Sequence, residues 1–288
     1  MIWLPLAFIT ALCESLKDVF GKLSLKTSNI YIVGLAYRLF SLPFILPLFF
    51  FIEIPEIKAN FYLALIAGGF LNIIVTVLYM KALKHSDLSL TVPFLTFTPL
   101  FMLITSPVIV GEFPNKWGLM GVLLIVSGAY LMYFKPGRTA FNNPFKIILK
   151  EKGSRYMLLI AFIWSITANF DKMGIQNSSP MFWVLSISIF LTLGMFFLAL
   201  FVARSELVQL RTHFKALLPV GLFSAASITT QMLAVSLTLV TYVISIKRTS
   251  ALIGVLFGYF LFKEQGIRNR LIGTIIMILG VFLIGILG

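Results

Sequence analysis

The stretch MFWVLSISIFLTLGMFFLALFV, residues 181–202, contains no charged side chain. A helix rises about 1.5 Å per residue, so this stretch is long enough to cross the roughly 30 Å apolar core of a bilayer. The rest of the chain is similar in character, because 59% of its 288 residues are hydrophobic and 11% are charged. Soluble domains carry about twice that share of charge, so the composition indicates an integral membrane protein.

Ten apolar stretches of this kind follow one another, which predicts an all-α membrane protein with about ten transmembrane helices. In the first half of the chain they cover residues 2–25, 30–52, 61–83, 88–110 and 117–134. In the second half they cover residues 156–175, 181–202, 216–237, 241–262 and 271–287. The first stretch has no basic segment before it and no small-residue cleavage site, so we interpret it as a retained helix and not as a signal peptide.

The distribution of positive charge predicts how the chain is inserted. The net charge is +13, and nearly all Lys and Arg residues outside the spans lie in connections that follow odd-numbered spans. The connections after even-numbered spans contain only Lys58 and Lys116. Lys and Arg are retained in the cytoplasm during insertion, so both termini are expected to be extracytoplasmic in a cell membrane. The excess charge is thus a topology signal, and no nucleic-acid partner is expected.

The two halves of the chain share residues at a constant spacing, 152 residues for the last helices of each half and 150 near their starts. The matched pairs include Glu112 with Glu264, Gly121 with Gly273, Gly128 with Gly280, and Lys22 with Lys172. Five helices are an odd number, so the second half must enter the membrane from the opposite side, as in the inverted repeats of secondary transporters. We therefore predict a five-helix repeat at 1–134, a basic linker loop at 135–155 and a second five-helix repeat at 156–288, arranged around a central cavity.

Four charged residues share one broad face of the first predicted helix, in which successive residues turn by about 100°: Glu14, Lys17, Asp18 and Lys22. Ionisable groups inside a membrane are costly and usually face a cavity or a partner. One interpretation is a cavity wall at which Glu14 or Asp18 exchanges a proton. The alternative is an intrahelical network with the ion pairs Glu14–Lys17 and Asp18–Lys22. Since the sixth span carries a counterpart of this face, a coupling or gating role is predicted for Glu14, Asp18, Lys22, Asp171 and Lys172.

Lys247 and Arg248 are adjacent cations well inside the ninth span. Such a pair requires anions, water or carboxylates around it. Arg can hold an oxyanion with two donors while Lys adds a point charge, so the pair predicts an anionic ligand. A salt bridge to Asp18 or Asp171 is the competing interpretation. The other residues predicted to bind the substrate are polar or aromatic: Asn72, Tyr79, Thr96, Trp164, Asn169 and Gln231.

Proline and glycine mark two further features of the predicted bundle. Pro93 and Pro99 remove backbone hydrogen bonds near Thr96, which predicts a discontinuous or kinked fourth helix. Glycines at small-residue spacing, such as Gly254 and Gly258, favour close helix contacts within the bundle, with a dimer interface as the alternative. The expected state is therefore a monomer or a weak homodimer.

The residue types that support enzymatic chemistry are scarce. Cys13 is the single cysteine, and His85 and His213 have no cysteine or carboxylate at metal-ligand spacing. The sequence has neither an HExxH zinc pattern nor a phosphate-binding Walker loop. We expect no metal site, no cofactor and no enzymatic activity. An intramembrane enzyme or a non-transporting scaffold remains the alternative from another class.

These features together resemble the drug/metabolite transporter superfamily, specifically its ten-helix EamA-type proteins. The resemblance covers nearly the whole chain and includes Pro99 and the two endings Gly111-Glu112 and Lys263-Glu264, each of which leads into a glycine-bearing helix. It implies a transporter with a central cavity and with both termini in the cytoplasm, opposite to the orientation that the charges predict.

The resemblance also bears on the substrate. Lys247-Arg248 is similar to the Lys-Arg pair with which plastid sugar-phosphate translocators hold phosphate. Those relatives have a further lysine four residues before a proline, where this chain has Leu95. The hypothesis is a secondary transporter of a small anionic metabolite, phosphorylated or carboxylated, that works by alternating access. The alternative is an exporter of amino acids or of drug-like neutral or cationic solutes. The expected partners are therefore a small-molecule solute and the lipid bilayer.

Overall fold

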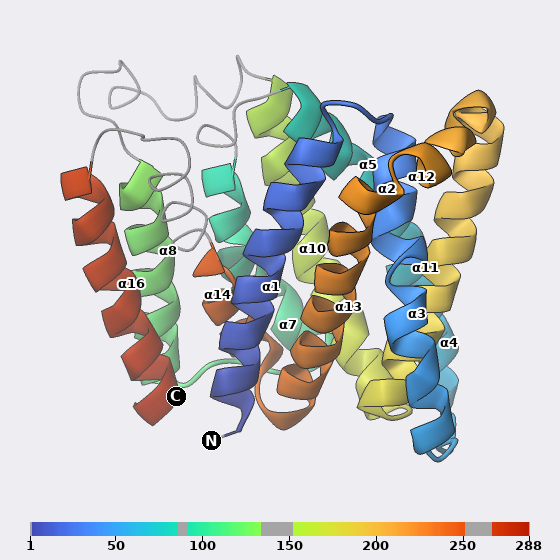
Figure 1. Ribbon diagram of the computed structural model, residues 1–288. Helices are drawn as coiled ribbons and strands as arrows, with labels where there is room; N and C mark the ends of the chain where they lie inside the picture. Colours follow the sequence, from blue (N-terminus) through green and yellow to red (C-terminus); the bar gives the residue numbers. More distant parts are fainter. Residues whose placement is uncertain (1, 86–91, 134–151, 251–266, 288) are drawn as a thin grey trace.

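The computed structural model describes residues 2–85, 92–133, 152–250 and 267–287, and all regular structure in these ranges is helical, with no strand (Figure 1). The first half contains α1 (Trp3–Ser24), α2 (Ile30–Leu39), α3 (Leu42–Ile45), η1 (Leu46–Phe51), α4 (Ala59–Leu63), η2 (Ala64–Gly68), α5 (Gly69–His85), η3 (Val92–Phe97), α7 (Thr98–Ile109) and α8 (Lys116–Tyr133). The second half contains α10 (Lys152–Gln176), α11 (Pro180–Val202), η5 (Arg204–Val208), α12 (Gln209–Thr212), α13 (Phe214–Leu237), α14 (Val240–Lys247) and α16 (Ile267–Leu287).

Over the residues that the structure describes, each of the ten predicted spans is largely helical, with turns at residues 40–41 and 248–249. Within the described ranges, five helical segments are both long and apolar enough to cross a membrane: Ile30–Phe51, Ala59–Lys84, Arg155–Gln176, Pro180–Val202 and Phe214–Leu237. Shorter apolar helices cover Phe94–Ile109, Lys116–Ala129 and Ile275–Leu287. Large apolar side chains point outward, and those of Phe50 and Phe201 are 84% and 86% exposed. Such an apolar exterior suits lipid, and the chain is a multi-pass membrane protein.

The fourth span is discontinuous, as its prolines predict. It begins as the 3₁₀ helix η3 and becomes α-helical only at Thr98, with Pro99 in the first turn of α7. Proline is tolerated there because the first N–H groups of a helix have no intrahelical acceptor. The Thr98 hydroxyl donates a hydrogen bond to the Leu95 carbonyl at 2.7 Å. This break places the Thr98 side chain inside the bundle, where it is completely buried.

Two glycine-bearing helices, α8 and α16, pack closely at one side of the bundle (Figure 1). A Cβ atom on Gly121 would lie 2.7 Å from the Gly280 carbonyl oxygen, and one on Gly280 would lie 2.6 Å from the Gly121 oxygen. No larger residue fits at either position without a shift of backbone, so these glycines serve helix contact within the chain. The other predicted pair, Gly254 and Gly258, lies outside the described residues.

The remaining helices pair across the two halves. α1 lies along α13, α10 along α5 and α7, α2 along α11, and α14 against α7 and α1. Both termini lie at one end of the bundle, opposite the end at which α8 stops and α10 starts (Figure 1). This packing brings the polar faces of helices from both halves together in the interior.

Candidate functional site

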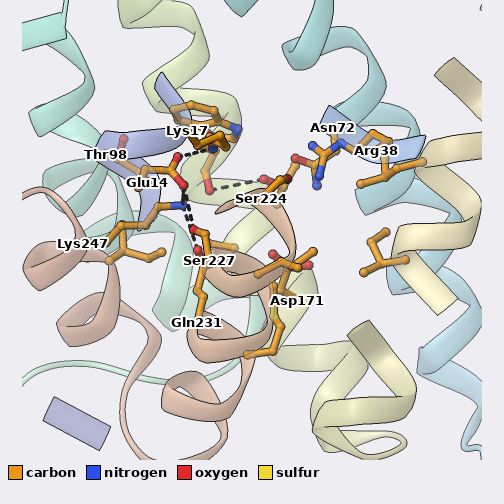
Figure 2. A pocket seen from close by; sticks show the side chains of 18 of the residues that line it. Glu14, Lys17, Arg38, Asn72, Thr98, Asp171, Ser224, Ser227, Gln231 and Lys247 are labelled. Atoms are coloured by element: carbon orange, nitrogen blue, oxygen red, sulfur yellow. Dashed lines mark hydrogen bonds and ion pairs between the residues drawn. The ribbon is translucent and has the colours of Figure 1, made fainter. Parts of the chain in front are cut away.

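An internal cavity of about 110 Å³ lies among α1, α2, α5, α7, α10, α11, α13 and α14 (Figure 2). Its polar lining includes four cations, Lys17, Arg38, Lys247 and Arg248, and two acids, Glu14 and Asp171. The other polar lining residues are Asn72, Thr98, Trp164, Thr167, Ser224, Ser227 and Gln231. Of the predicted substrate-binding residues, the cavity thus brings together Lys247, Arg248, Asn72, Trp164 and Gln231.

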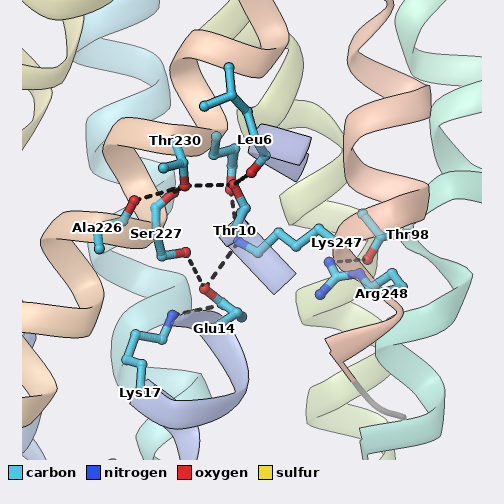
Figure 3. Close-up of polar contacts among 11 residues, drawn as sticks. Leu6, Thr10, Glu14, Lys17, Thr98, Ala226, Ser227, Thr230, Lys247 and Arg248 are labelled. Atoms are coloured by element: carbon cyan, nitrogen blue, oxygen red, sulfur yellow. Dashed lines mark hydrogen bonds and ion pairs between the residues drawn. The ribbon is translucent and has the colours of Figure 1, made fainter. Parts of the chain in front are cut away.

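Glu14 is the centre of an ion-pair network on one wall of the cavity (Figure 3). Its Oε1 lies 2.7 Å from the Lys17 Nζ, and its Oε2 lies 3.3 Å from the Lys247 Nζ. The Ser227 hydroxyl donates to the same Oε2 at 2.8 Å, and the Lys247 Nζ also donates to the Gln231 Oε1 at 2.8 Å. The predicted Glu14–Lys17 pair is present, and it belongs to a network that includes α13 and α14.

The acid that meets Lys247 is therefore Glu14, which corrects the expectation of Asp18 or Asp171. The reason lies in the packing of α1 against α13 and α14, which directs Glu14 toward Ser227 and Lys247. The Asp171 Oδ1 instead accepts a hydrogen bond from the Trp183 Nε1 at 3.0 Å. Asp18 accepts a hydrogen bond from the Tyr79 hydroxyl, and its Oδ1 is buried without a hydrogen-bond partner.

Arg248 lies where α14 ends, because the helix runs only to Lys247 and the chain turns at Arg248 and Thr249. Its Nη2 donates to the Thr98 Oγ1 at 2.8 Å (Figure 3). Its guanidinium lies 5.1 Å from the centre of the Trp164 ring. A guanidinium over the face of Trp is held by cation–π attraction. The local end of the helix is the irregularity that allows two adjacent cations to face one cavity. A helix C-terminus also favours nearby positive charge.

Several predicted residues support this site without lining the cavity. The Tyr79 ring packs against the Trp164 ring at a centroid distance of 5.3 Å and so supports the surface under Arg248. The Asn169 amide donates to the Thr105 hydroxyl at 3.1 Å and to the Ser165 carbonyl at 2.6 Å, and thereby connects α10 to α7. Thr96 is buried in η3, and the hydroxyl that reaches Arg248 belongs to Thr98. Lys22 lies in the last turn of α1 and is half-buried.

Lys172 lies in a second ion pair near the end of the bundle that carries the termini. Its Nζ is 3.1 Å from the Glu112 Oε1 and donates to the carbonyls of Val235 and Thr238 at 2.7 and 2.9 Å. The Glu112 Oε2 accepts a hydrogen bond from the backbone N–H of Val240, the first residue of α14, at 3.0 Å. Of these residues, Glu112, Lys172 and Thr238 line a separate hollow of about 440 Å³. Lys172 thus points away from the central cavity, although the adjacent Asp171 lines it.

Sequence reasoning left Arg38, Ser224 and Ser227 out of the predicted site. Arg38 carried a usable signal, because a charged residue inside an apolar span usually faces a cavity. The serines carried none, since isolated hydroxyls are common in membrane helices. Among the described residues, no group of three His, Cys, Asp or Glu side chains is placed to hold a metal ion.

A helical membrane protein whose cavity is lined by charged residues from helices of both halves has the organisation of a solute transporter. The chain belongs to the EamA-like transporter family, which matches residues 1–134 and again residues 151–286. The resemblance drawn from the sequence is thereby confirmed, and the protein is a membrane transporter of the drug/metabolite transporter superfamily.

No curated protein sequence matches the chain. A solved crystal structure, described only as that of a protein, matches the fold with a TM-score of 0.76 at 11% sequence identity. The match covers 99% of this chain and 96% of that chain, so the fold is shared over the whole length.

Proposed function

We propose that the protein is a secondary transporter of a small anionic metabolite, phosphorylated or carboxylated, and that the central cavity is its binding site. The observation that supports this most is Arg248, which is 7% exposed and carries a buried Nε without a hydrogen-bond partner. Its described contacts are a neutral hydroxyl and an aromatic ring, neither of which neutralises its charge. An oxyanion would supply both the charge and the acceptors that this guanidinium lacks.

The balance of charge in the cavity favours an anion over the alternative solutes. Among the described residues, four cations line it against two acids, and Glu14 is already shared by Lys17 and Lys247. A cationic or neutral drug-like solute would leave the arginines without a counter-ion, which is costly in a membrane. EamA-like proteins are transporters and not enzymes, and we propose that this chain works without a cofactor, as a monomer or weak homodimer.

The helix pairing supports an inverted five-plus-five repeat in which the first repeat is 1–134 and the second is 156–288. Exchange of the two halves converts the contact of α1 with α13 into the contact of α10 with α5, and both contacts are present. The contacts of α2 with α11, α7 with α14, and α8 with α16 each convert into themselves. Such a symmetry lets one repeat rock against the other around a fixed site, which is the basis of alternating access.

The Glu112–Lys172 pair then acts as a gate on the side of the termini. The pair connects the segment before α8 to α10 and, through the Lys172 bond to the Val235 carbonyl, to α13. The same segment contacts the end of α16, because the Asn115 amide donates a hydrogen bond to the Leu287 carbonyl at 2.9 Å. On α10, Lys172 directly follows Asp171, which lines the cavity. On α13, the Val235 carbonyl lies one turn beyond Gln231, another lining residue. The ion pair thus lies one turn from the cavity and links parts of both halves. It is therefore placed to close the cavity toward the side of the termini.

A transport assay with purified protein in proteoliposomes tests the proposal. A metabolite mixture is offered with or without a pH gradient, and the accumulated solutes are identified by mass spectrometry. Lys247→Gln and Arg248→Gln should abolish uptake while expression and insertion stay normal, and inorganic phosphate or small carboxylates should compete with the transported solute. Arg204→Gln is the matched control, because Arg204 is exposed in η5. Uptake of a neutral or cationic solute that ignores these anions and both substitutions would overturn the proposal.

A further inference from the structure

Arg38 is the cavity cation for which the structure shows the weakest bonding. It lies in α2, and its guanidinium reaches the cavity beside Asn72 (Figure 2). Its Nη2 donates to the Thr76 hydroxyl at 3.4 Å, which is long for a hydrogen bond. Its Nε is buried and has no hydrogen-bond partner. Within the described ranges, no carboxylate lies within ion-pair distance of Arg38, whereas Glu14 serves both Lys17 and Lys247.

Arg38 and the cations of α14 approach the cavity from different directions. Figure 2 shows Arg38 on one side and Lys247 on the other, with Ser224 and Asp171 between them. Arg38 belongs to the wall formed by α2 and α5, while Lys247 is the last residue of α14 and Arg248 directly follows it. The cavity therefore has cations on two separate walls, and the acid Asp171 and the Ser224 hydroxyl lie between them.

A guanidinium with no carboxylate at ion-pair distance is expensive at this depth and binds oxyanions well, because its planar fork offers two parallel donors. We infer that Arg38 is a second anion-binding residue and that the transported solute carries two anionic groups. One group would bind Lys247 and Arg248, and the other would bind Arg38 beside the Asn72 amide. This inference rests on the proposed function and names the substrate class more narrowly.

The size of the cavity limits what joins the two anionic groups. An engineered cavity of about 150 Å³ in another protein holds one benzene molecule, whereas the cavity here measures about 110 Å³. The solute is therefore compact, with a short carbon chain between its anionic groups. A short dicarboxylate and a small acid that bears a phosphate both satisfy this description.

A binding assay with the purified full-length protein in detergent tests the inference. Binding is measured as the shift of the thermal unfolding transition that each ligand causes. The probes are acetate and inorganic phosphate as compounds with one anionic group, and malonate, succinate and phosphoglycolate as compounds with two. The wild type should bind at least one of the compounds with two anionic groups more tightly than it binds acetate or inorganic phosphate. Arg38→Gln should lower that affinity by about tenfold or more, the value of a charge-assisted hydrogen bond, and lower the affinity for acetate and phosphate by a smaller factor.

Three further variants separate the possible outcomes. Arg248→Gln should weaken the binding of every probe. If Arg248→Gln binds the probes as tightly as the wild type does, the proposed function is overturned. Arg204→Gln should change none of the affinities. Arg38→Lys keeps the charge but loses the fork, so it should weaken the preferred probe less than Arg38→Gln does. Equal losses for all probes in Arg38→Gln, or unchanged binding in both Arg38 variants, would overturn the role of Arg38 alone. If Arg38→Gln fails to fold, Arg38→Lys alone decides the question. Unchanged affinity of Arg38→Lys for the preferred probe would then overturn the role of Arg38.

Discussion

Glu112→Gln is the substitution that tests the gate most directly, because it removes one charge and almost no volume. The carboxylate Oε1 lies 3.1 Å from the Lys172 Nζ, and the Oε2 accepts the Val240 N–H at 3.0 Å. A glutamine retains one carbonyl oxygen, which can still accept the bond from the start of α14. The substitution therefore breaks the ion pair and keeps the helix contact.

The size of the effect follows from how far the pair is removed from water. The side chains of Lys172 and Glu112 are 9% and 14% exposed. Removal of one partner from a buried pair costs about 3–5 kcal/mol. Lys172 retains two carbonyl acceptors, from Val235 and Thr238, which reduces the loss. A cost of about 2 kcal/mol to the closed state would change the ratio of closed to open molecules about thirtyfold.

The assay is the accessibility of a thiol inside the central cavity. Cys13 is first replaced by Ser, so that Ile228→Cys, which lines the cavity on α13, provides the single reactive group. A membrane-impermeant thiol reagent is then applied from the side of the termini. Opening of the gate should raise the labelling rate in Glu112→Gln, by up to about thirtyfold if opening limits the reaction.

The control variant is Lys116→Gln, which removes a charge from the same connection. The Lys116 ammonium lies 5.3 Å from the centre of the Trp117 ring and is not part of the Glu112–Lys172 pair. Its labelling rate should equal that of the parent. If Glu112→Gln labels no faster than the parent, or if Lys116→Gln labels equally fast, the pair is not a gate.

Two further predictions concern coupling and topology. Glu14→Gln and Asp18→Asn should each insert normally, and at least one of them should flatten the pH dependence of uptake in proteoliposomes; if both keep the wild-type profile, these acids are structural. Reporter fusions that fluoresce only in the cytoplasm should be bright in the 135–155 linker and dark at Gly288, because the basic residues lie in the odd-numbered connections. The reverse pattern would place both termini in the cytoplasm. It would show that the family resemblance predicts the orientation correctly and that the charge bias does not.

The helical spans could be predicted from the sequence because a membrane imposes one dominant constraint, a long apolar stretch with internally bonded backbone. The break in the fourth span was also predictable, since Pro99 acts on its own backbone. Both features depend on residues that are close along the chain. The basic residues that predict the orientation can likewise be read from the sequence, connection by connection. The resemblance to the family implies the opposite orientation. The fold is the same in either case.

The partners of the charged residues could not be predicted in the same way, because they depend on which helices pack together. Lys247 pairs with Glu14, which is more than 200 positions away, and neither Asp18 nor Asp171 forms that bridge in the described structure. Asp171 and Lys172 are neighbours in the sequence, but on a helix they point about 100° apart. One therefore lines the central cavity, while the other reaches Glu112 near the termini.

The ion pairs in the cavity also bear on how the proposed anion transporter would return after it releases its solute. A bare cation is costly inside a membrane, and Glu14 pairs with both Lys17 and Lys247. An anion that binds Lys247 must compete with this carboxylate, so Glu14 lowers the affinity for the solute and at the same time balances the charge of the empty site. Within the described residues, no carboxylate lies at ion-pair distance from Arg38 or Arg248. In the proposed mechanism the two arginines therefore provide the preference for the solute, while Lys247 exchanges its bond to Glu14 for one to the anion.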